Sequence, residues 1–209
     1  SGYLRDILIA IFLGSGPIAD AFFVAFRIPN TFRRLFSEGT FNAAFVPSYT
    51  SEMVKGKKQS NKLANDIFNL LLLGLLLITI VVQLFMPAFV SLIAPGFVGD
   101  FDKMEIAITL TRITFPFLLF ICLASFFAAI LNSHNKFAVT SGAPIILNII
   151  LVLVLLFSVS LGDKLVYYLS YGVSLAGLLQ LLFLYKFVRK HYSLNIKFEI
   201  KITEKVKIF

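Results

Sequence analysis

Seven charged residues lie within or beside apolar segments of this sequence, where a charge is costly. They are Arg5, Asp6, Arg27, Arg33, Arg34, Glu38 and Arg112. An arginine at the centre of a membrane-spanning helix costs about 2.5–3.5 kcal/mol on insertion scales, so such residues normally face a cavity, a partner or an interface. A guanidinium binds phosphate oxygens in a bidentate manner and stays charged at any relevant pH. Because arginines outnumber acids in these segments, the set favours an anionic substrate over a cationic one.

Arg5 is the most costly of these charges. It lies eight residues before Leu13, the end of the first apolar run, which is about 12 Å along a helix. A water-filled functional cavity and an internal ion pair with Asp20 or Asp6 are both compatible with this position. Because neighbouring residues on a helix point about 100° apart, we expect Asp6 to pair with another span.

The segment from Ile18 to Tyr49 places four of the other charges on one of two polar stripes. Its 32 residues would extend about 48 Å as one helix, so we expect bends or breaks at Pro29 and Gly39. On an unbroken helix, one stripe consists of Asp20, Arg27, Thr31, Arg34 and Glu38. Beyond a kink, a second stripe consists of Asn30, Arg33 and Ser37. Arg33 and Arg34 point about 100° apart, so we expect one to face a central cavity and the other to extend to the cytoplasmic interface.

Ordinary structural explanations also exist for some of these charges. Arg34 and Glu38 are spaced as a modest surface pair on one helix. Arg112 lies near the start of its apolar run and fits a side chain that extends outward to the interface.

The rest of the sequence does not indicate an enzyme active site. His134 and His191 are far apart and lack the helical spacing of metal ligands. Cys122 is the single cysteine and lies in an apolar run, which excludes a disulfide framework and a cysteine metal site. The sequence also lacks a glycine-rich phosphate loop and a GxSxG motif. We therefore expect no cofactor and no enzymatic activity.

The composition indicates the kind of element that must position these charges. Of 209 residues, 58% are hydrophobic and 14% are charged, and the mean hydropathy is +0.90. Soluble domains carry roughly 45–50% apolar and about 25% charged residues. The composition therefore excludes a disordered chain and most soluble enzymes, and it indicates an integral membrane protein.

Five apolar runs are long enough to cross a bilayer as helices. They are about Ile18–Phe36, Leu63–Phe85, Ile106–Leu131, Phe137–Leu161 and Leu165–Phe187. A sixth, Tyr3–Leu13, is short, and we expect it to be the remainder of a longer helix truncated at its N-terminus. Leu70–Leu77 does not alternate, which argues against a β-barrel. The prediction is an all-α integral membrane protein, a polytopic helical bundle of about six transmembrane helices.

We expect residues 1–187 to form a transmembrane lobe, followed by a basic cytoplasmic or interfacial linker over residues 188–209. Within the linker, Asn195–Ile202 alternates polar and apolar residues, as a strand or an interfacial segment does. A basic segment lying on the anionic inner leaflet is the simpler interpretation.

Basic residues are distributed unevenly between the two ends of the predicted spans. Twelve lie on one side, after Tyr49, at Lys136 and from Lys186 onward, whereas Lys103 and Lys164 are the two on the other side. Positively charged loops normally stay in the cytoplasm, so we expect the side with twelve, and the N-terminus, to be cytoplasmic. The net charge of +8 therefore indicates membrane orientation, and we expect no nucleic-acid partner.

Several motifs, in order along the chain, carry a family resemblance. They are Arg5-Asp6 with the following ILIAIFLG, Ala19–Asn30 (ADAFFVAFRIPN), Phe32–Phe36 (FRRLF), Glu38-Gly39, Ala44–Pro47 (AFVP), Ala94–Phe97 (APGF), Thr114–Pro116 (TFP) and Ala129–Asn132 (AILN). In these residues the sequence closely resembles the MurJ/MviN family of lipid II flippases, within the multidrug/oligosaccharidyl-lipid/polysaccharide exporter superfamily. The resemblance implies two lobes around a cationic cavity, of which this chain would be the first.

The resemblance also implies roles for the arginines. Arg5 and Arg33 match cavity arginines expected to engage the pyrophosphate of the substrate. The stripe on an unbroken helix would instead select Arg27 and Arg34, which we therefore expect to act as supporting or ion-pairing residues. We follow the motif, because the stripe assumes one continuous helix and Pro29 interrupts it.

Acidic positions match the family as well. Asp6 and Asp20 match residues expected to orient arginines, and Glu38 matches a position suited to an ion-pair gate between lobes. A further arginine of the family would lie before Ser1, and the second lobe has no counterpart in this sequence. We therefore expect a fragment of the N-terminal lobe.

The implied function is alternating-access transport of lipid II, the undecaprenyl-pyrophosphate-linked peptidoglycan precursor, across the bacterial cytoplasmic membrane. Its expected partners are lipid II, membrane lipids and the second lobe. One alternative is a flippase or exporter for another polyprenyl-linked glycan. Another is a membrane assembly protein in which the charges form ion pairs between subunits. Water access to Arg5 and Arg33 distinguishes a flippase from an assembly protein, which would bury both.

Overall fold

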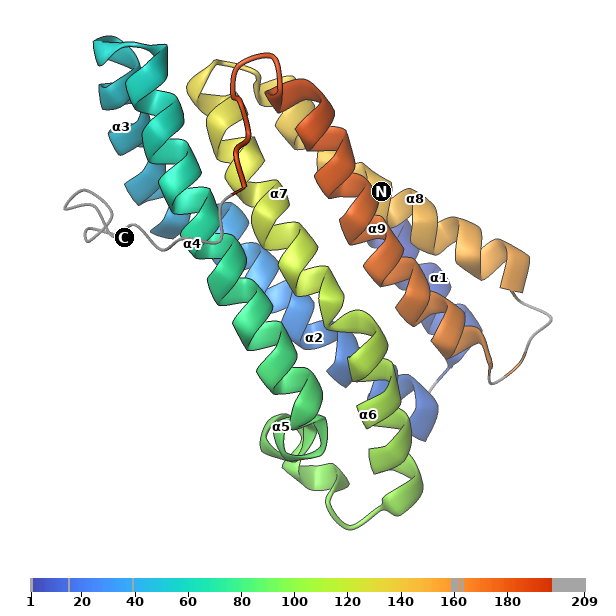
Figure 1. The fold of residues 1–209 in the computed structure, drawn as a ribbon. Helices are drawn as coiled ribbons and strands as arrows, with labels where there is room; N and C mark the ends of the chain where they lie inside the picture. Colours follow the sequence, from blue (N-terminus) through green and yellow to red (C-terminus); the bar gives the residue numbers. More distant parts are fainter. Residues whose placement is uncertain (1, 15, 39, 159–161, 163, 197–209) are drawn as a thin grey trace.

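The described part of the chain is a bundle of helices joined by short turns (Figure 1). The computed structural model describes residues 2–14, 16–38, 40–158, 162 and 164–196, and only the backbone of residues 28–30, 32–38, 40 and 158. Its elements are α1 (Gly2–Leu13), α2 (Pro17–Glu38), α3 (Thr40–Lys55), α4 (Lys57–Leu84), α5 (Met86–Ile93), the 3-10 turn η1 (Pro95–Phe97), α6 (Phe101–Thr114), α7 (Pro116–Ser133), α8 (Phe137–Ser158) and α9 (Leu165–Val188).

Four segments are long and apolar enough to cross a membrane. They are Lys57–Leu84, Phe101–Ser133, Phe137–Phe157 and Leu165–Val188. The second contains both α6 and α7, which meet at Phe115, just before Pro116. The remaining long prediction, Ile18–Phe36, lies within α2, and α2 carries several charges along its length. The predicted all-α membrane fold is confirmed, although α3 and α5 were not expected as separate helices.

Glycine and proline mark several of the helix boundaries. Gly14 has a φ of 64° directly after α1, and Pro17 is the first residue of α2, as the predicted turn requires. Gly56, with a φ of 130°, separates α3 from α4. Pro29 lies inside α2, so the helix does not end there, and Gly39 lies outside the described residues.

The buried core is centred on α7, which packs against α2, α3, α4 and α9. The ring of Phe126 on α7 lies 5.1 Å from that of Phe45 on α3 and 5.5 Å from that of Phe68 on α4, measured between centroids. It also lies 6.1 Å from the ring of Tyr192, which follows α9. These tilted and edge-on contacts are the arrangements that aromatic rings favour. They bring three helices and the segment after α9 together at one end of the bundle.

Two glycines allow α9 to fit between α7 and α8. A Cβ atom at Gly177 would lie 2.6 Å from Cδ2 of Phe117 on α7, which is too close for any other residue without movement. A Cβ atom at Gly172 would lie 3.1 Å from Cγ2 of Val154 on α8. Small residues permit this close approach of helices in membranes. The position of α9 in turn fixes the turn that follows it.

The segment after α9 is tied to α4 by the amide of Asn65. Its Oδ1 accepts hydrogen bonds from the Tyr192 hydroxyl and from the Asn195 backbone nitrogen, each at 2.7 Å. Its Nδ2 donates to the carbonyls of Ser193 at 3.1 Å and Asn61 at 2.9 Å. The start of the predicted linker is therefore bound to the bundle. The predicted strand or interfacial segment lies outside the described residues beyond Ile196.

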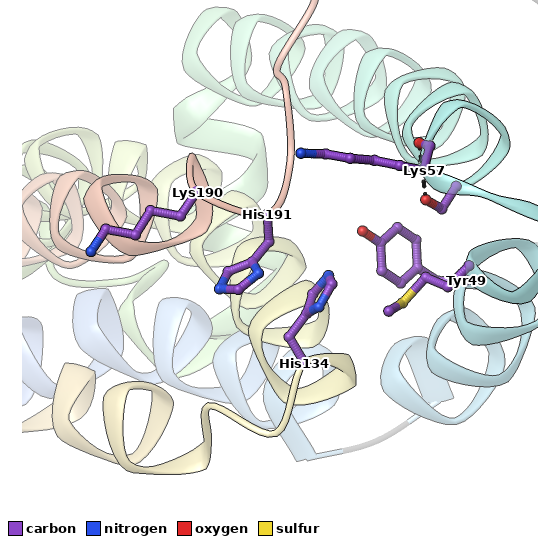
Figure 2. A pocket seen from close by; sticks show the side chains of 7 residues that line it. Tyr49, Lys57, His134, Lys190 and His191 are labelled. Carbon is purple, nitrogen blue, oxygen red and sulfur yellow. Dashed lines mark hydrogen bonds between the residues drawn. The ribbon is translucent and has the colours of Figure 1, made fainter.

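A pocket of about 230 Å³ opens at this end of the bundle (Figure 2). The α3–α4 junction, the α7–α8 turn and the end of α9 meet there, and the α5–α6 connection lies at the other end (Figure 1). Lys57, His134 and His191 are among the residues that line it. The two histidines, widely separated in sequence, are thus brought together by the packing of α7 against α9.

Candidate functional site

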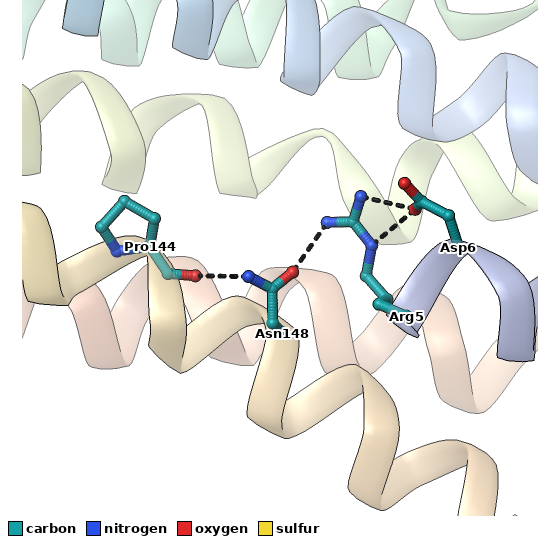
Figure 3. A network of polar contacts seen from close by, with 4 residues as sticks. All are labelled: Arg5, Asp6, Pro144 and Asn148. Atoms are coloured by element: carbon teal, nitrogen blue, oxygen red, sulfur yellow. Dashed lines mark hydrogen bonds and ion pairs between the residues drawn. The ribbon is translucent and has the colours of Figure 1, made fainter. Parts of the chain in front are cut away.

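The guanidinium of Arg5 is the centre of a polar network between α1 and α8 (Figure 3). Its Nε and Nη2 atoms both donate to Oδ1 of Asp6, at 2.8 Å and 2.6 Å. Its Nη1 atom donates to Oδ1 of Asn148 on α8 at 3.1 Å. The fork of the arginine therefore joins a carboxylate on its own helix to an amide on another.

Asn148 is itself held in a fixed orientation. Its Nδ2 atom donates to the carbonyl of Pro144, one turn earlier on α8, at 3.3 Å. That bond directs the amide nitrogen toward its own helix and leaves the amide oxygen facing Arg5. The oxygen of Asn148 thus accepts from the cation without adding a negative charge.

The Arg5 side chain is mostly enclosed, with 16% of its surface exposed, whereas 63% of the Asp6 side chain is exposed. The guanidinium carbon of Arg5 lies 5.8 Å from the centre of the Phe26 ring, within the range of a cation–π contact. An arginine has five N–H donors, and three bonds to described residues are formed here. The other two donors form no hydrogen bond within the described part of the chain.

The expectation that Asp6 pairs with another span is wrong. Asp6 and Arg5 form a direct ion pair although they are neighbours in sequence. Helix rotation sets where the Cβ atoms point, but a long arginine side chain can cover the angle between adjacent positions. Asp6 therefore holds the Arg5 guanidinium in this structure, and its role in the family stays a prediction.

Asp20 forms its described ion pair with a lysine and not with an arginine. Its Oδ2 atom lies 3.2 Å from Nζ of Lys103, which is in the first turn of α6. The helices α2 and α6 pack against one another, which brings this lysine within reach of Asp20. The ammonium of Lys103 also lies 5.0 Å from the centre of the Phe97 ring. The predicted role of Asp20 in orienting an arginine is thus not seen in this structure.

The remaining predicted residues lie along α2 and at the end of α6. Arg27 is exposed, and its carbonyl accepts a hydrogen bond from the Thr31 hydroxyl at 2.9 Å. Arg112 is exposed at the end of α6, and its carbonyl accepts from Nε2 of Gln83 at 2.9 Å. The side chains of three other predicted residues lie outside the described part of the structure, namely Arg33, Arg34 and Glu38.

Two residues of these networks were missed from the sequence, Asn148 and Lys103. A signal for Asn148 existed, because an amide in the middle of a long apolar helix normally needs a partner on another helix. Lys103 was assigned to an external loop, and its contact with Asp20 depends on how α2 meets α6. Among the described residues, no group of three or more histidine, cysteine, aspartate or glutamate residues is arranged to hold a metal ion.

Comparison with known proteins gives a consistent result. A family model described as lipid II flippase MurJ matches residues 9–209. The probable lipid II flippase MurJ of Rhizobium meliloti is 44% identical over 193 residues, which cover 90% of this chain and 36% of that protein. The corresponding protein of Rhizobium tropici is 42% identical over 200 residues, which cover 93% of this chain and 37% of that protein.

A solved structure, described as lipid II flippase MurJ in an inward closed conformation, has the same fold. It superposes with a TM-score of 0.85 at 27% identity, covering 99% of this chain and 43% of that chain. The chain thus spans little more than a third of the length of the curated relatives that it matches. The match to the family model begins at Ile9, so Arg5 and Asp6 precede it.

Proposed function

This chain belongs to the lipid II flippase MurJ family of multi-pass bacterial membrane proteins, and from that premise we propose that it forms the first lobe of a two-lobe lipid II flippase. The transported molecule would be the undecaprenyl-pyrophosphate-linked peptidoglycan precursor, moved from the inner to the outer leaflet of the cytoplasmic membrane. The activity is transport, with no chemical conversion of the substrate.

The Arg5 network is the observation that carries this proposal. Its guanidinium is held by two acceptors, Asp6 and Asn148, and retains two N–H donors for phosphate oxygens. Because the side chain is already ordered, little conformational entropy is lost when the anion binds. The neighbouring carboxylate of Asp6 limits the net positive charge, which favours release of the pyrophosphate after transport.

The proposed mechanism is alternating access, in which two lobes move about a site near the membrane midplane. Arg5 would bind the pyrophosphate together with Arg33, the second arginine that the motif selects. The polyprenyl tail would stay in the lipid throughout. Glu38 would form an ion-pair gate with the second lobe, and Arg27 would supply a further positive charge on α2.

In the orientation that we propose, the end of the bundle that carries the Lys57 pocket, here called the Lys57 end, faces the cytoplasm. Lys57, Lys136 and Lys190 gather near the same two histidines at this end, although they come from three separate parts of the sequence. At the other end, the first turn of α6 carries Asp102 and Lys103. The positive-inside rule then puts α6's first turn outside and the N-terminus of the chain in the cytoplasm.

The test measures lipid II in the outer leaflet of cells depleted of their own lipid II flippase. The full-length protein carrying this lobe would be expressed as the native sequence, Arg5→Ala, Arg33→Ala and the control Arg112→Ala, at matched membrane levels. We expect the native protein and the Arg112→Ala control to expose lipid II, and both site variants to lose at least about 100-fold in rate, as for removal of a group that binds charge in a low-dielectric site.

Each other outcome is informative in a different way. Normal transport by the Arg5→Ala and Arg33→Ala variants would show that the site lies elsewhere. Insertion of the native protein without lipid II exposure would contradict the substrate assignment and favour another polyprenyl-linked glycan. Probe-inaccessible Arg5 and Arg33 in the assembled protein would favour an assembly role.

A further inference from the structure

The pocket at the Lys57 end of the bundle is lined by four basic side chains, those of Lys57, Lys190, His134 and His191. Lys57 comes from the start of α4, and Tyr49 and Ser60 flank it from α3 and α4. His134 and His191 face one another from the α7–α8 turn and the turn after α9 (Figure 2). Among the described lining residues there is no carboxylate. The nearby acid Glu52 is already paired with Lys55 at 2.8 Å.

The two imidazole rings are stacked on one another. Their centroids lie 4.3 Å apart, and their planes are inclined by 28°. The Nε2 atom of His134 is buried and has no hydrogen-bond partner among the described residues. A buried polar atom without a partner costs free energy, so a group that orders this site can improve its bonding.

The charged side chains that act on the imidazole pair, among the described residues, are cationic. Burial lowers the pKa of His134, and the positive charges of His191, Lys57 and Lys136 lower it further. Burial likewise lowers the pKa of His191, followed by Lys136, Lys57 and Lys190. Tyr49, the remaining titratable group in the pocket, has its pKa raised by burial and stays neutral. A bound anion would offset this excess of positive charge.

A second, larger cavity of about 430 Å³ adjoins the first, and the two share Lys190 and His191. Its other lining residues are mainly apolar, including Leu131, Val139 and Phe187. A polar cationic pocket beside an apolar cavity matches the two parts of a phospholipid. Basic pockets at the cytoplasmic ends of membrane helices suit anionic headgroups.

We propose that this pocket binds the phosphate of an anionic phospholipid, with Lys57 as the fixed cation, the imidazole pair as N–H donors and the adjoining cavity as the place of an acyl chain. The pocket volume of about 230 Å³ is several times the volume of about 30 Å³ that one water molecule occupies. This leaves room for a phosphate and part of its glycerol. The site is separate from the Arg5 network, which lies between α1 and α8.

Binding at this site takes up protons. In the empty pocket both imidazoles are neutral at pH 7, because burial and the lysines have lowered each pKa from its ordinary value of 6.5. A phosphate favours the charged imidazolium and raises both pKa values. The affinity for the lipid therefore rises as the pH falls from neutral, and the lipid's phosphodiester itself stays singly charged across this range.

The experiment uses the full-length protein in nanodiscs of zwitterionic phosphatidylcholine, titrated with a fluorescent short-chain phosphatidylglycerol at pH 7.5 and pH 5.5. We expect tighter binding at the lower pH, and about tenfold weaker binding for Lys57→Gln, which loses a charge-assisted contact. Lys57→Arg should retain binding. Lys164→Gln is the matched control, because Lys164 is exposed before α9, away from this pocket.

The double variant His134→Gln/His191→Gln should bind with little dependence on pH, and its melting temperature checks that it is folded. Equal loss in Lys57→Gln and Lys164→Gln would overturn the proposal, since it would show general surface attraction. Sulfate stays doubly charged over this pH range and serves as a soluble probe. If sulfate competes as effectively as the lipid, the site binds a soluble anion and the lipid assignment is wrong. Transport is not measured, so failure here leaves the flippase proposal untouched.

Discussion

The Arg5 network and the Lys57 pocket both present positive charge, but they differ in whether a carboxylate is paired with it. Arg5 is paired with a carboxylate 2.6 Å away and is also held by an amide from α8. The Lys57 pocket brings two imidazoles and two lysines together with no carboxylate among its described lining residues. A charge between apolar helices needs a partner to be tolerated, whereas one at a helix end can be solvated. This difference agrees with our two proposals, an anion that is bound and released at the first site and one that stays at the second.

Among the variants that distinguish the two sites, we expect Arg5→Lys to change the transport rate most. Lysine keeps the charge but is a single point donor, so it cannot hold Asp6 and Asn148 with the same fork. We expect transport to fall at least about tenfold, and the rate of lipid II exposure at matched expression measures it. Arg112→Lys is the matched control. Native rates for Arg5→Lys would mean that charge alone is required.

A smaller effect is expected for Asn148→Leu, which removes the bond to Nη1 of Arg5 but leaves the ion pair with Asp6. The loss of one such bond corresponds to about 0.5–1.5 kcal/mol, or roughly threefold to tenfold in transport rate. Asn148→Asp should lose more than Asn148→Leu, because a second carboxylate would neutralise the cation that we propose binds the substrate. If the two variants are equal, Asn148 acts only by packing against α1.

The histidine pair makes the stability of the protein depend on pH. Both imidazoles have lowered pKa values in the folded state, so the unfolded chain takes up protons first as the pH falls below 6.5. Stability is therefore full above pH 6.5 and declines as the pH falls through the folded pKa values. Melting temperatures in detergent between pH 7.5 and 5 measure this. The double variant His134→Gln/His191→Gln should make the melting temperature depend less on pH. An unchanged dependence would show that other groups cause it.

The smallest effect is expected for the pair of Asp20 and Lys103. More than half of the Asp20 side chain is exposed, and such surface pairs contribute at most about 1 kcal/mol. Lys103→Met should therefore change the melting temperature and the transport rate only slightly. Asp20→Asn should behave in the same way if the ion pair is its only role. A large loss for Asp20→Asn alone would show that Asp20 contacts an arginine in another conformation.

Much of the fold was predictable because long apolar runs specify membrane helices directly. The sequence did not reveal that the run from Ile106 to Leu131 divides at Pro116, since a proline in such a run can also produce only a kink. The insertion cost of Arg5 makes it a candidate from the sequence alone, but its contact with Asn148 depends on α1 meeting α8. The histidine pair was not predictable, because 57 positions separate the two residues and only the packing of α7 against α9 brings them together.

The amide of Asn65 has a consequence for the order of events during synthesis. Its partner Tyr192 follows it by 127 positions, so at about 5–20 residues per second the ribosome needs roughly 6–25 s to deliver that residue. During this interval the helix carrying Asn65 is already made, yet the amide has only its bond to the Asn61 carbonyl from this set. Until then, water, lipid headgroups or the insertion machinery must form the other hydrogen bonds of this amide. In the nascent chain, the Asn65 amide of α4 therefore acquires its remaining hydrogen bonds within the protein only after the segment beyond α9 has been synthesised.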